Sequence, residues 1–160
     1  MKKFMLIVLA VVVAATVTYA AAGRSSEGLV EKAENAALNA DIRKVEVYAK
    51  GESQLFTYTG TGAFNVYTCD LAGAGTVLSD VDGVLGAAVF YDGRLTLSDV
   101  LEEYGATAIS IEEGENCTLV YAYAKGCGRG VVSDGRQINM QIVLKEDATV
   151  VGSPLVMGSY

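Results

Sequence analysis

The amino-acid sequence predicts a single α+β domain, in which one or two helices cover one face of a curved, largely antiparallel sheet. The chain has 160 residues, which is room for one ordinary domain. Two segments, residues 25–41 and 96–104, have the apolar spacing of helices, whereas most of the remainder alternates between apolar and polar residues as strands do. Short connections containing glycine join several of these strand segments, and such connections favour antiparallel neighbours.

The first 22 residues have the layout of a secretory signal peptide. Lys2 and Lys3 give a positive start, residues 4–17 form an unbroken apolar run, and small residues follow. A membrane-spanning helix needs roughly 20 apolar residues, more than this run supplies, so we expect cleavage after Ala20 or Ala22. The alternative is an uncleaved N-terminal anchor, because the alanines at 20–22 bring the run close to that length.

Residues 23–42 are expected to form an N-terminal helical region, and residues 43–160 a single α+β domain. Ser25 or Ser26 can cap the helix, and acidic residues follow in its first turns. Its apolar face consists mostly of alanine methyl groups and is therefore narrow. We expect this helix to lie at the edge of the domain, or to form a partly ordered stalk.

The segments that follow read as strands up to residue 71. Residues 44–48 alternate, and residues 54–59 and 62–71 are rich in Thr, Tyr, Phe and Val. Only Gly60-Thr61-Gly62 separates the latter two, so we expect them to pair as a hairpin. Residues 71–75 read as a loop of alanine and glycine, and residues 76–85 as irregular.

The C-terminal half has clearer signals. An apolar strand at 86–91 ends at an Asp-Gly turn, and Thr96 is the expected N-cap of a helix whose buried stripe ends at Tyr104, with Gly105 after it. Ser133-Asp134-Gly135 is a hairpin signal. The expected strands are residues 107–111, 117–124, 137–144 and 149–156.

This C-terminal half resembles the YwmB family, which are exported bacterial proteins with a TATA-box-binding-protein-like fold. The similarity lies in residues 89–95, in the hairpin segment 134–144, which reads DGRQINMQIVL, and in the ending GSPLV at 152–156 with a final Tyr160. The resemblance implies a shortened member of that fold, because the helix expected after the first strands is missing from the pattern. It implies no catalytic residue, and a fold does not fix a function.

Composition excludes several chemistries. There is no histidine, so Ser-His-Asp and Cys-His arrangements and His-liganded zinc sites are excluded. The net charge is −7, and removing residues 1–22 takes away two lysines and no acid, which leaves 10 basic and 19 acidic residues and a net of −9. We therefore expect no nucleic-acid partner, and we expect no cofactor.

Three further patterns carry weaker signals. The glycine-rich residues 126–130 precede a hairpin rather than a helix, which disfavours a phosphate loop. An irregular calcium site would need Asp80, Asp82 and Asp92 to converge, and a solvated loop is the preferred interpretation. Glutamates at 112, 113 and 115 surround a glycine turn, where neighbouring carboxylates point into water rather than across a cleft. We therefore assign no metal site and no catalytic residue.

The three cysteines are an odd number for an exported protein. Cys117 and Cys127 stand at opposite ends of one predicted strand, roughly 25–30 Å apart at about 3.3 Å per residue, which is too far for a bridge. Cys69 with Cys117 is the preferred disulfide. Three unpaired thiols are the alternative.

Tyr121 and Tyr123 share one face of a predicted strand and form a candidate binding surface, although tyrosines that pack a sheet against a helix explain the pattern as well. The sequence therefore predicts an exported, non-catalytic binding or structural protein of the bacterial cell envelope, with an envelope protein or polymer as its partner. The alternatives are a small extracytoplasmic enzyme with a carboxylate-based site, and a membrane-anchored surface domain, which would contact the membrane only through a retained N-terminal segment.

Overall fold

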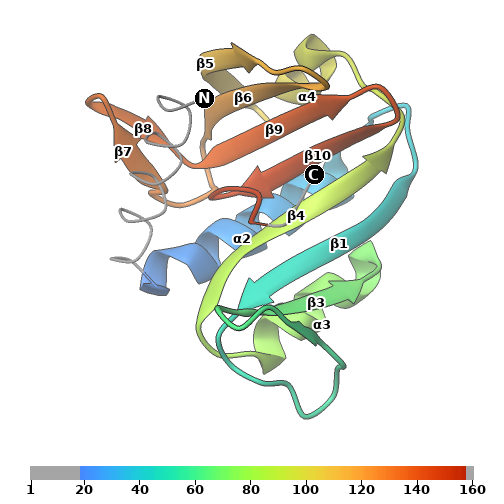
Figure 1. The fold of residues 1–160 in the computed structure, drawn as a ribbon, viewed down its shortest axis with the longest axis vertical. Helices are drawn as coiled ribbons and strands as arrows, with labels where there is room; N and C mark the ends of the chain where they lie inside the picture. Colours follow the sequence, from blue (N-terminus) through green and yellow to red (C-terminus); the bar gives the residue numbers. More distant parts are fainter. Residues whose placement is uncertain (1–18, 158–160) are drawn as a thin grey trace.

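The computed structural model describes residues 19–157, with side chains from residue 24. The described chain is an α+β fold built on an eight-stranded sheet, and every strand pair in it is antiparallel (Figure 1). The strand order is β2-β3-β1-β4-β10-β9-β6-β5, and β7 and β8 form a separate hairpin. The strands are β1 (Ile42–Ala49), β2 (Thr59–Gly60), β3 (Asn65–Cys69), β4 (Val84–Asp92), β5 (Ala106–Glu113), β6 (Cys117–Ala124), β7 (Val131–Ser133), β8 (Arg136–Ile138), β9 (Met140–Lys145) and β10 (Ala148–Ser153).

Three described helices lie on one side of this sheet: α2 (Tyr19–Asn35), α3 (Leu71–Asp80) and α4 (Leu97–Glu103). They pack on the main core, to which the sheet contributes alternate residues such as Val45 and Val47 of β1 and Met140 and Ile142 of β9. This alternation is the period-two pattern of the sequence, with one face of each strand turned towards the helices. The expected architecture is confirmed.

Helix α2 does not lie at the domain edge, and this expectation was wrong. It crosses the helix-side face of the sheet against β4 and β10, and Leu29 is 0% exposed. The narrow face is sufficient because the helix approaches a turn closely: the Ser25 hydroxyl donates to the Cys127 carbonyl oxygen, and Gly28 packs on Gly126. Small side chains at this contact allow the larger Leu29 and Val30 to reach the core.

A second correction concerns residues 71–80, which are helical rather than the loop and irregular chain that their composition predicts. They form α3, which begins after Asp70, whose Oδ1 accepts from the Gly73 amide at 2.7 Å. Ala74, Val77 and Leu78 are buried at helical spacing. Tertiary packing of these three residues stabilises a segment whose glycines disfavour a helix on their own. The sequence pattern shows no helix after the first strands, where the YwmB-like fold has one. Helix α3 lies at that place in the chain.

The hairpin expected from residues 54–59 and 62–71 is also largely wrong. β2 has two residues, and the main partner of β3 is β1. The residues before β2 form a loop, which Ser53 holds by accepting from the amides of Leu55 and Phe56 at 2.9 and 2.7 Å and by donating to Asp80. Because Ser53 satisfies these amides locally, the segment has less need of a strand partner.

The C-terminal half follows the sequence signals closely. Thr96 caps α4 by accepting from the Asp99 amide, and Asp134 and Gly135 both have positive φ, as a tight hairpin turn requires. The strand expected at 137–144 is interrupted at Asn139, whose side chain hydrogen-bonds both the N–H and the carbonyl oxygen of Ala124. The Asn139 side chain therefore takes the place of a backbone partner for Ala124, at the point where the β7–β8 hairpin joins the main sheet.

The opposite face of the sheet holds a second, smaller cluster, and residues 154–157 return across it. Val156 packs with Val143, Val150 and Tyr48, and its amide donates to Gln141 Oε1 at 2.9 Å. The approach is close because Gly152 has no side chain: a Cβ there would lie 2.9 Å from the Val156 nitrogen. The end of the described chain is thereby fixed to the sheet.

We predict opposite effects for alanine at two helical glycines. At Gly28 a Cβ would lie 2.9 Å from the Gly126 carbonyl carbon and closer still to its oxygen, so Gly28→Ala should lower the free energy of unfolding by about 1–3 kcal/mol through overpacking. At Gly75 in α3 a Cβ meets nothing within 4 Å, so Gly75→Ala should raise it by about 0.5–1 kcal/mol. Urea unfolding measures both, and equal stabilisation by the two substitutions would contradict the helix contact.

Candidate functional site

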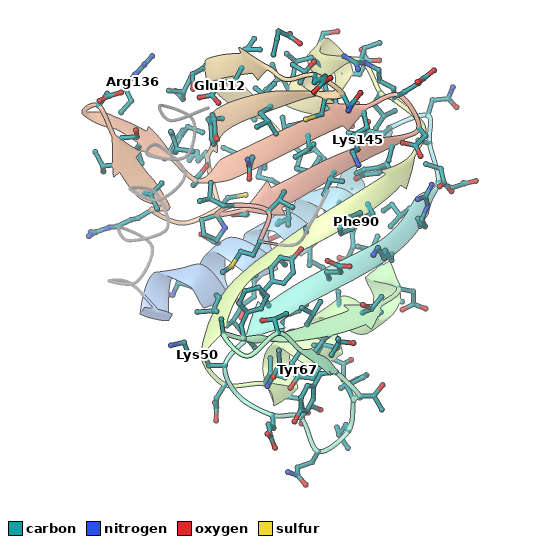
Figure 2. The ribbon with its side chains drawn as sticks, in the orientation of Figure 1. Lys50, Tyr67, Phe90, Glu112, Arg136 and Lys145 are labelled. Atoms are coloured by element: carbon teal, nitrogen blue, oxygen red, sulfur yellow. The ribbon has the colours of Figure 1, made fainter. Side chains whose placement is uncertain are left out.

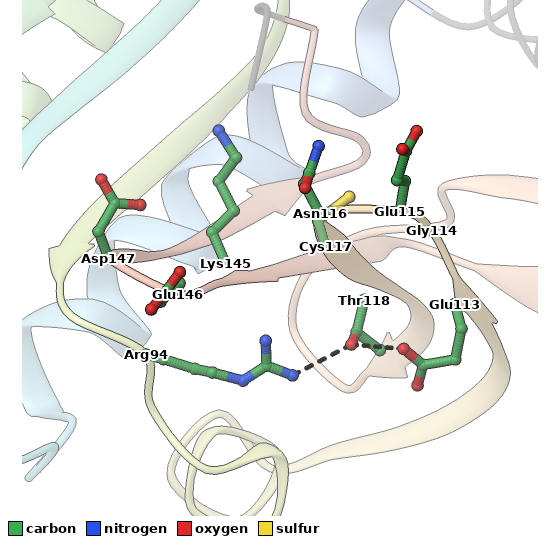
Figure 3. A pocket seen from close by; sticks show the side chains of 10 residues that line it. All are labelled: Arg94, Glu113, Gly114, Glu115, Asn116, Cys117, Thr118, Lys145, Glu146 and Asp147. Carbon is green, nitrogen blue, oxygen red and sulfur yellow. Dashed lines mark hydrogen bonds between the residues drawn. The ribbon is translucent and has the colours of Figure 1, made fainter.

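The structure forms an open pocket of about 650 Å³ at one end of the sheet (Figure 3). Three turns supply its lining, namely those between β4 and α4, between β5 and β6, and between β9 and β10. The charged lining consists of four carboxylates and two cations: Glu113, Glu115, Glu146, Asp147, Arg94 and Lys145. The pocket therefore carries both signs of charge, with acid in excess.

A chain of hydrogen bonds fixes one wall of this pocket. Arg94 Nη2 donates to Thr118 Oγ1 at 3.2 Å, and Thr118 Oγ1 donates to Glu113 Oε2 at 2.8 Å (Figure 3). Thr118 is buried, so its hydroxyl needs both partners, and it holds the cation and the carboxylate in one orientation. Such fixed, charge-assisted hydrogen bonds suit recognition of a polar ligand.

Of the three glutamates considered in the sequence, the structure brings two to the pocket. Glu113 and Glu115 line it, whereas Glu112 faces the other side of the sheet opposite Leu119. No local sequence pattern signals the pocket itself, because its residues come from three separate turns. Among the described residues, no group of three or more acidic, cysteine or histidine side chains is arranged to hold a metal ion.

Tyr121 and Tyr123 both lie on the sheet face away from the helices. Their neighbours on β6, Val120 and Ala122, belong to the helix-side core, so alternation places the tyrosines on the other face, where both are half-buried. Tyr121 is opposite Gln141 of β9. The two rings are therefore not the ones that pack the sheet against the helices, and they remain candidates for a binding surface.

A buried tyrosine pair packs under the helices instead. The hydroxyls of Tyr91 in β4 and Tyr104 at the end of α4 are 2.6 Å apart. Burial is the main cause that raises the pKa of Tyr91, and it raises the pKa of Tyr104 well above its ordinary value. Both groups therefore stay protonated at neutral pH, and their hydrogen bond ties α4 to the centre of the sheet.

The disulfide between Cys69 and Cys117 is absent, and all three cysteines are free thiols. Cys69 lies on β3 and Cys117 on β6, and five strand spacings of about 4.8 Å separate them, roughly 24 Å in all. A bridge needs Cα atoms within about 7 Å. The sequence could not reveal this distance, because it depends on the strand order.

The three thiols differ in their surroundings. Burial, and secondarily the charge of Asp70, raises the pKa of Cys69 to about 11. Burial also raises the pKa of Cys127, against which Lys32 and a hydrogen bond with Ser153 act in the opposite direction. Cys117 is half-buried, lines the pocket, and stands opposite Lys145 in the β6–β9 register.

The remaining sequence candidates lie apart from the pocket. In the glycine-rich turn at 126–130, the carbonyl oxygens of Gly128 and Arg129 accept from side chains, and the turn packs on α2. Asp80 accepts from Ser53, while Asp92 forms an ion pair with Arg43 at 2.6 Å. Each of these groups has a structural partner where it lies.

One charged cluster lies on the open sheet face, away from the pocket. Glu46 accepts from the Tyr48 hydroxyl at 2.9 Å and is ion-paired with Lys44, whose Nζ lies 4.4 Å above the centre of the Phe90 ring. A cation over an aromatic ring is attracted to its π-electrons. These contacts connect β1 to β4 on this face, and Figure 2 places Phe90 at the middle of the sheet.

Among the described residues, none of the helices combines the length and apolarity needed to cross a bilayer. No family model, curated protein or solved structure matches the chain. The function of the chain is therefore inferred from its own residues and geometry.

We predict that one thiol reacts rapidly in the native protein. At pH 8 a pKa of about 11 leaves about one Cys69 side chain in a thousand as thiolate, and Cys127 is buried, so an aromatic disulfide reagent should label Cys117 first. Cys117→Ser should remove the fast phase, and the matched Cys69→Ser should retain it. After unfolding without reductant, three thiols should react. A single reactive thiol after unfolding would show that a disulfide joins two of the three cysteines, and would contradict their description as free thiols.

Proposed function

We propose that this chain is an exported, non-catalytic binding or structural protein of the bacterial cell envelope, and that the pocket lined by Arg94, Glu113 and Lys145 is its ligand site. The observation that carries the proposal is the Arg94–Thr118–Glu113 hydrogen-bond chain. The Thr118 hydroxyl links the Arg94 cation to the Glu113 carboxylate and holds both at the pocket wall. This arrangement favours recognition of a polar, charged ligand over proton transfer. An envelope protein or polymer with such groups is the proposed partner.

Export is supported by the sequence of residues 1–22 and is compatible with the packing of α2. The expected cleavage positions, after Ala20 or Ala22, fall within the first turn of α2, before its buried residues Ser25, Leu29 and Ala33. Cleavage at either position leaves these contacts in the mature chain. Membership of the YwmB family, suggested by the hairpin and ending of the C-terminal half, is part of the same proposal.

Export predicts a defined N-terminus. When the full chain is produced in a bacterial host, the protein in the extracytoplasmic fraction should begin at residue 21 or 23. N-terminal sequencing or intact mass measures this directly. A chain that begins at Met1 and is dissolved in the cytoplasm would contradict export, whereas a membrane-bound chain beginning at Met1 would favour the anchored alternative.

The pocket proposal predicts that neutralising its cations weakens ligand binding. Arg94→Gln with Lys145→Gln should reduce the retention of envelope components on the immobilised mature domain by about tenfold or more, since a charged hydrogen bond contributes about 1.5–3 kcal/mol. Lys125→Gln with Arg129→Gln removes the same charge from exposed positions outside the pocket and should retain binding. Equal loss in both variants would overturn the assignment of the pocket, and chemical turnover of a ligand that Glu113→Gln abolishes would overturn the non-catalytic role.

A further inference from the structure

The two outer strands of the sheet differ greatly in length. One edge is β2, with two residues, and the other is β5, with eight, which pairs with β6 on one side only. A long edge strand presents unpaired N–H and C=O groups, which can pair with an added strand. β5 is therefore the sheet edge, within the described chain, that offers the greatest length for such pairing.

The middle of this edge is already occupied, and this limits where a partner can lie. The β5–β6 register shifts between Ala108 and Ser110, and the carbonyl oxygen of the intervening Ile109 accepts from Arg136 Nη1 at 3.0 Å. A bulge of this kind bends a strand and interrupts pairing. The open stretch is thus residues 110–113, and Figure 2 shows Glu112 and Arg136 towards the same upper margin of the molecule.

Charge on the open stretch indicates the kind of partner. Glu112 and Glu113 are consecutive, so they lie on opposite faces of the sheet, and a strand laid alongside meets a carboxylate on each face. Between Ser110 and these acids, Ile111 is 52% exposed and offers an apolar contact. A second copy of this chain brings no cation on its own residues 110–113, and each copy carries a net charge of −7.

We propose that residues 110–113 of β5 bind an extended basic segment of another protein by β-strand addition. In an antiparallel pairing, two Lys or Arg residues of the segment lie opposite Glu113 and Glu112, and an apolar residue follows opposite Ile111. Main-chain hydrogen bonds supply the affinity, and the charge pairs set the register. Glu113 also lines the pocket, whereas Glu112 does not, so a substitution at Glu112 tests this surface without changing the pocket lining.

Two capped, fluorescent peptides test the register by anisotropy against the mature domain. Peptide KKVTVT places lysine opposite Glu112, and KEVTVT places glutamate there; in both, the first four residues pair with Glu113 to Ser110 and the last two extend beyond the open stretch. The wild-type chain should prefer KKVTVT by about three- to tenfold, and Glu112→Lys should reverse that preference, because the exchange replaces an attractive cross-strand charge pair with a repulsive one. Glu31→Lys on α2 makes the same charge change at an exposed site and should behave as wild type.

A further control separates strand addition from simple charge attraction. KKPTVT has the same charge but lacks the N–H opposite Ile111, and it should bind at least tenfold more weakly than KKVTVT. The proposal is overturned if KKPTVT binds as well as KKVTVT, if Glu112→Lys and Glu31→Lys behave alike, or if the chain sediments as a dimer that binds neither peptide.

Discussion

The close contact between Gly28 of α2 and the turn at Gly126 is the constraint on which the packing of this fold depends. Without a side chain at Gly28, the helix backbone comes near enough for Ser25 to donate to Cys127 and for Leu29 to reach the core. The helix then covers β4 and β10 at the centre of the sheet and supports α3 beside it. If α2 lay farther from this turn, its narrow stripe of small residues would bury little apolar surface. The short separation between helix and turn therefore explains how α2 organises a core.

The two surfaces with functional potential lie where the regular structure ends. The pocket is made from turns at one end of the sheet, and the β5 edge is where the ladder of backbone hydrogen bonds ends. Antiparallel pairing along β9, β6 and β5 holds both surfaces in place, so their charged side chains are presented with little cost of ordering. Their excess of acid suits basic or mixed-charge partners, in keeping with the negative charge of the whole chain.

Sequence patterns predicted the elements whose signals are local. Residues 117–124 alternate and form β6 at those bounds, and the Thr96 cap and the Asp134-Gly135 turn lie where the residue types require them. Local signals failed where tertiary contacts decide. α3 is composed largely of small residues and becomes a helix by burying Val77 and Leu78, while the pocket and the separation of Cys69 from Cys117 follow from the order of strands in the sheet. Tyr121 and Tyr123 were correctly placed on one strand face, and the structure identifies that face as the one turned away from the helices.

Native-state amide hydrogen exchange tests most directly whether α2 and the sheet centre form one cooperative unit. With increasing denaturant, the amides of Leu29 and Val30 in α2 and of Ala88 and Val89 in β4 should converge on the same opening free energy as global unfolding. Helix amides that open with a much smaller free energy, while those of β4 remain protected, would show a detachable helix and contradict this account.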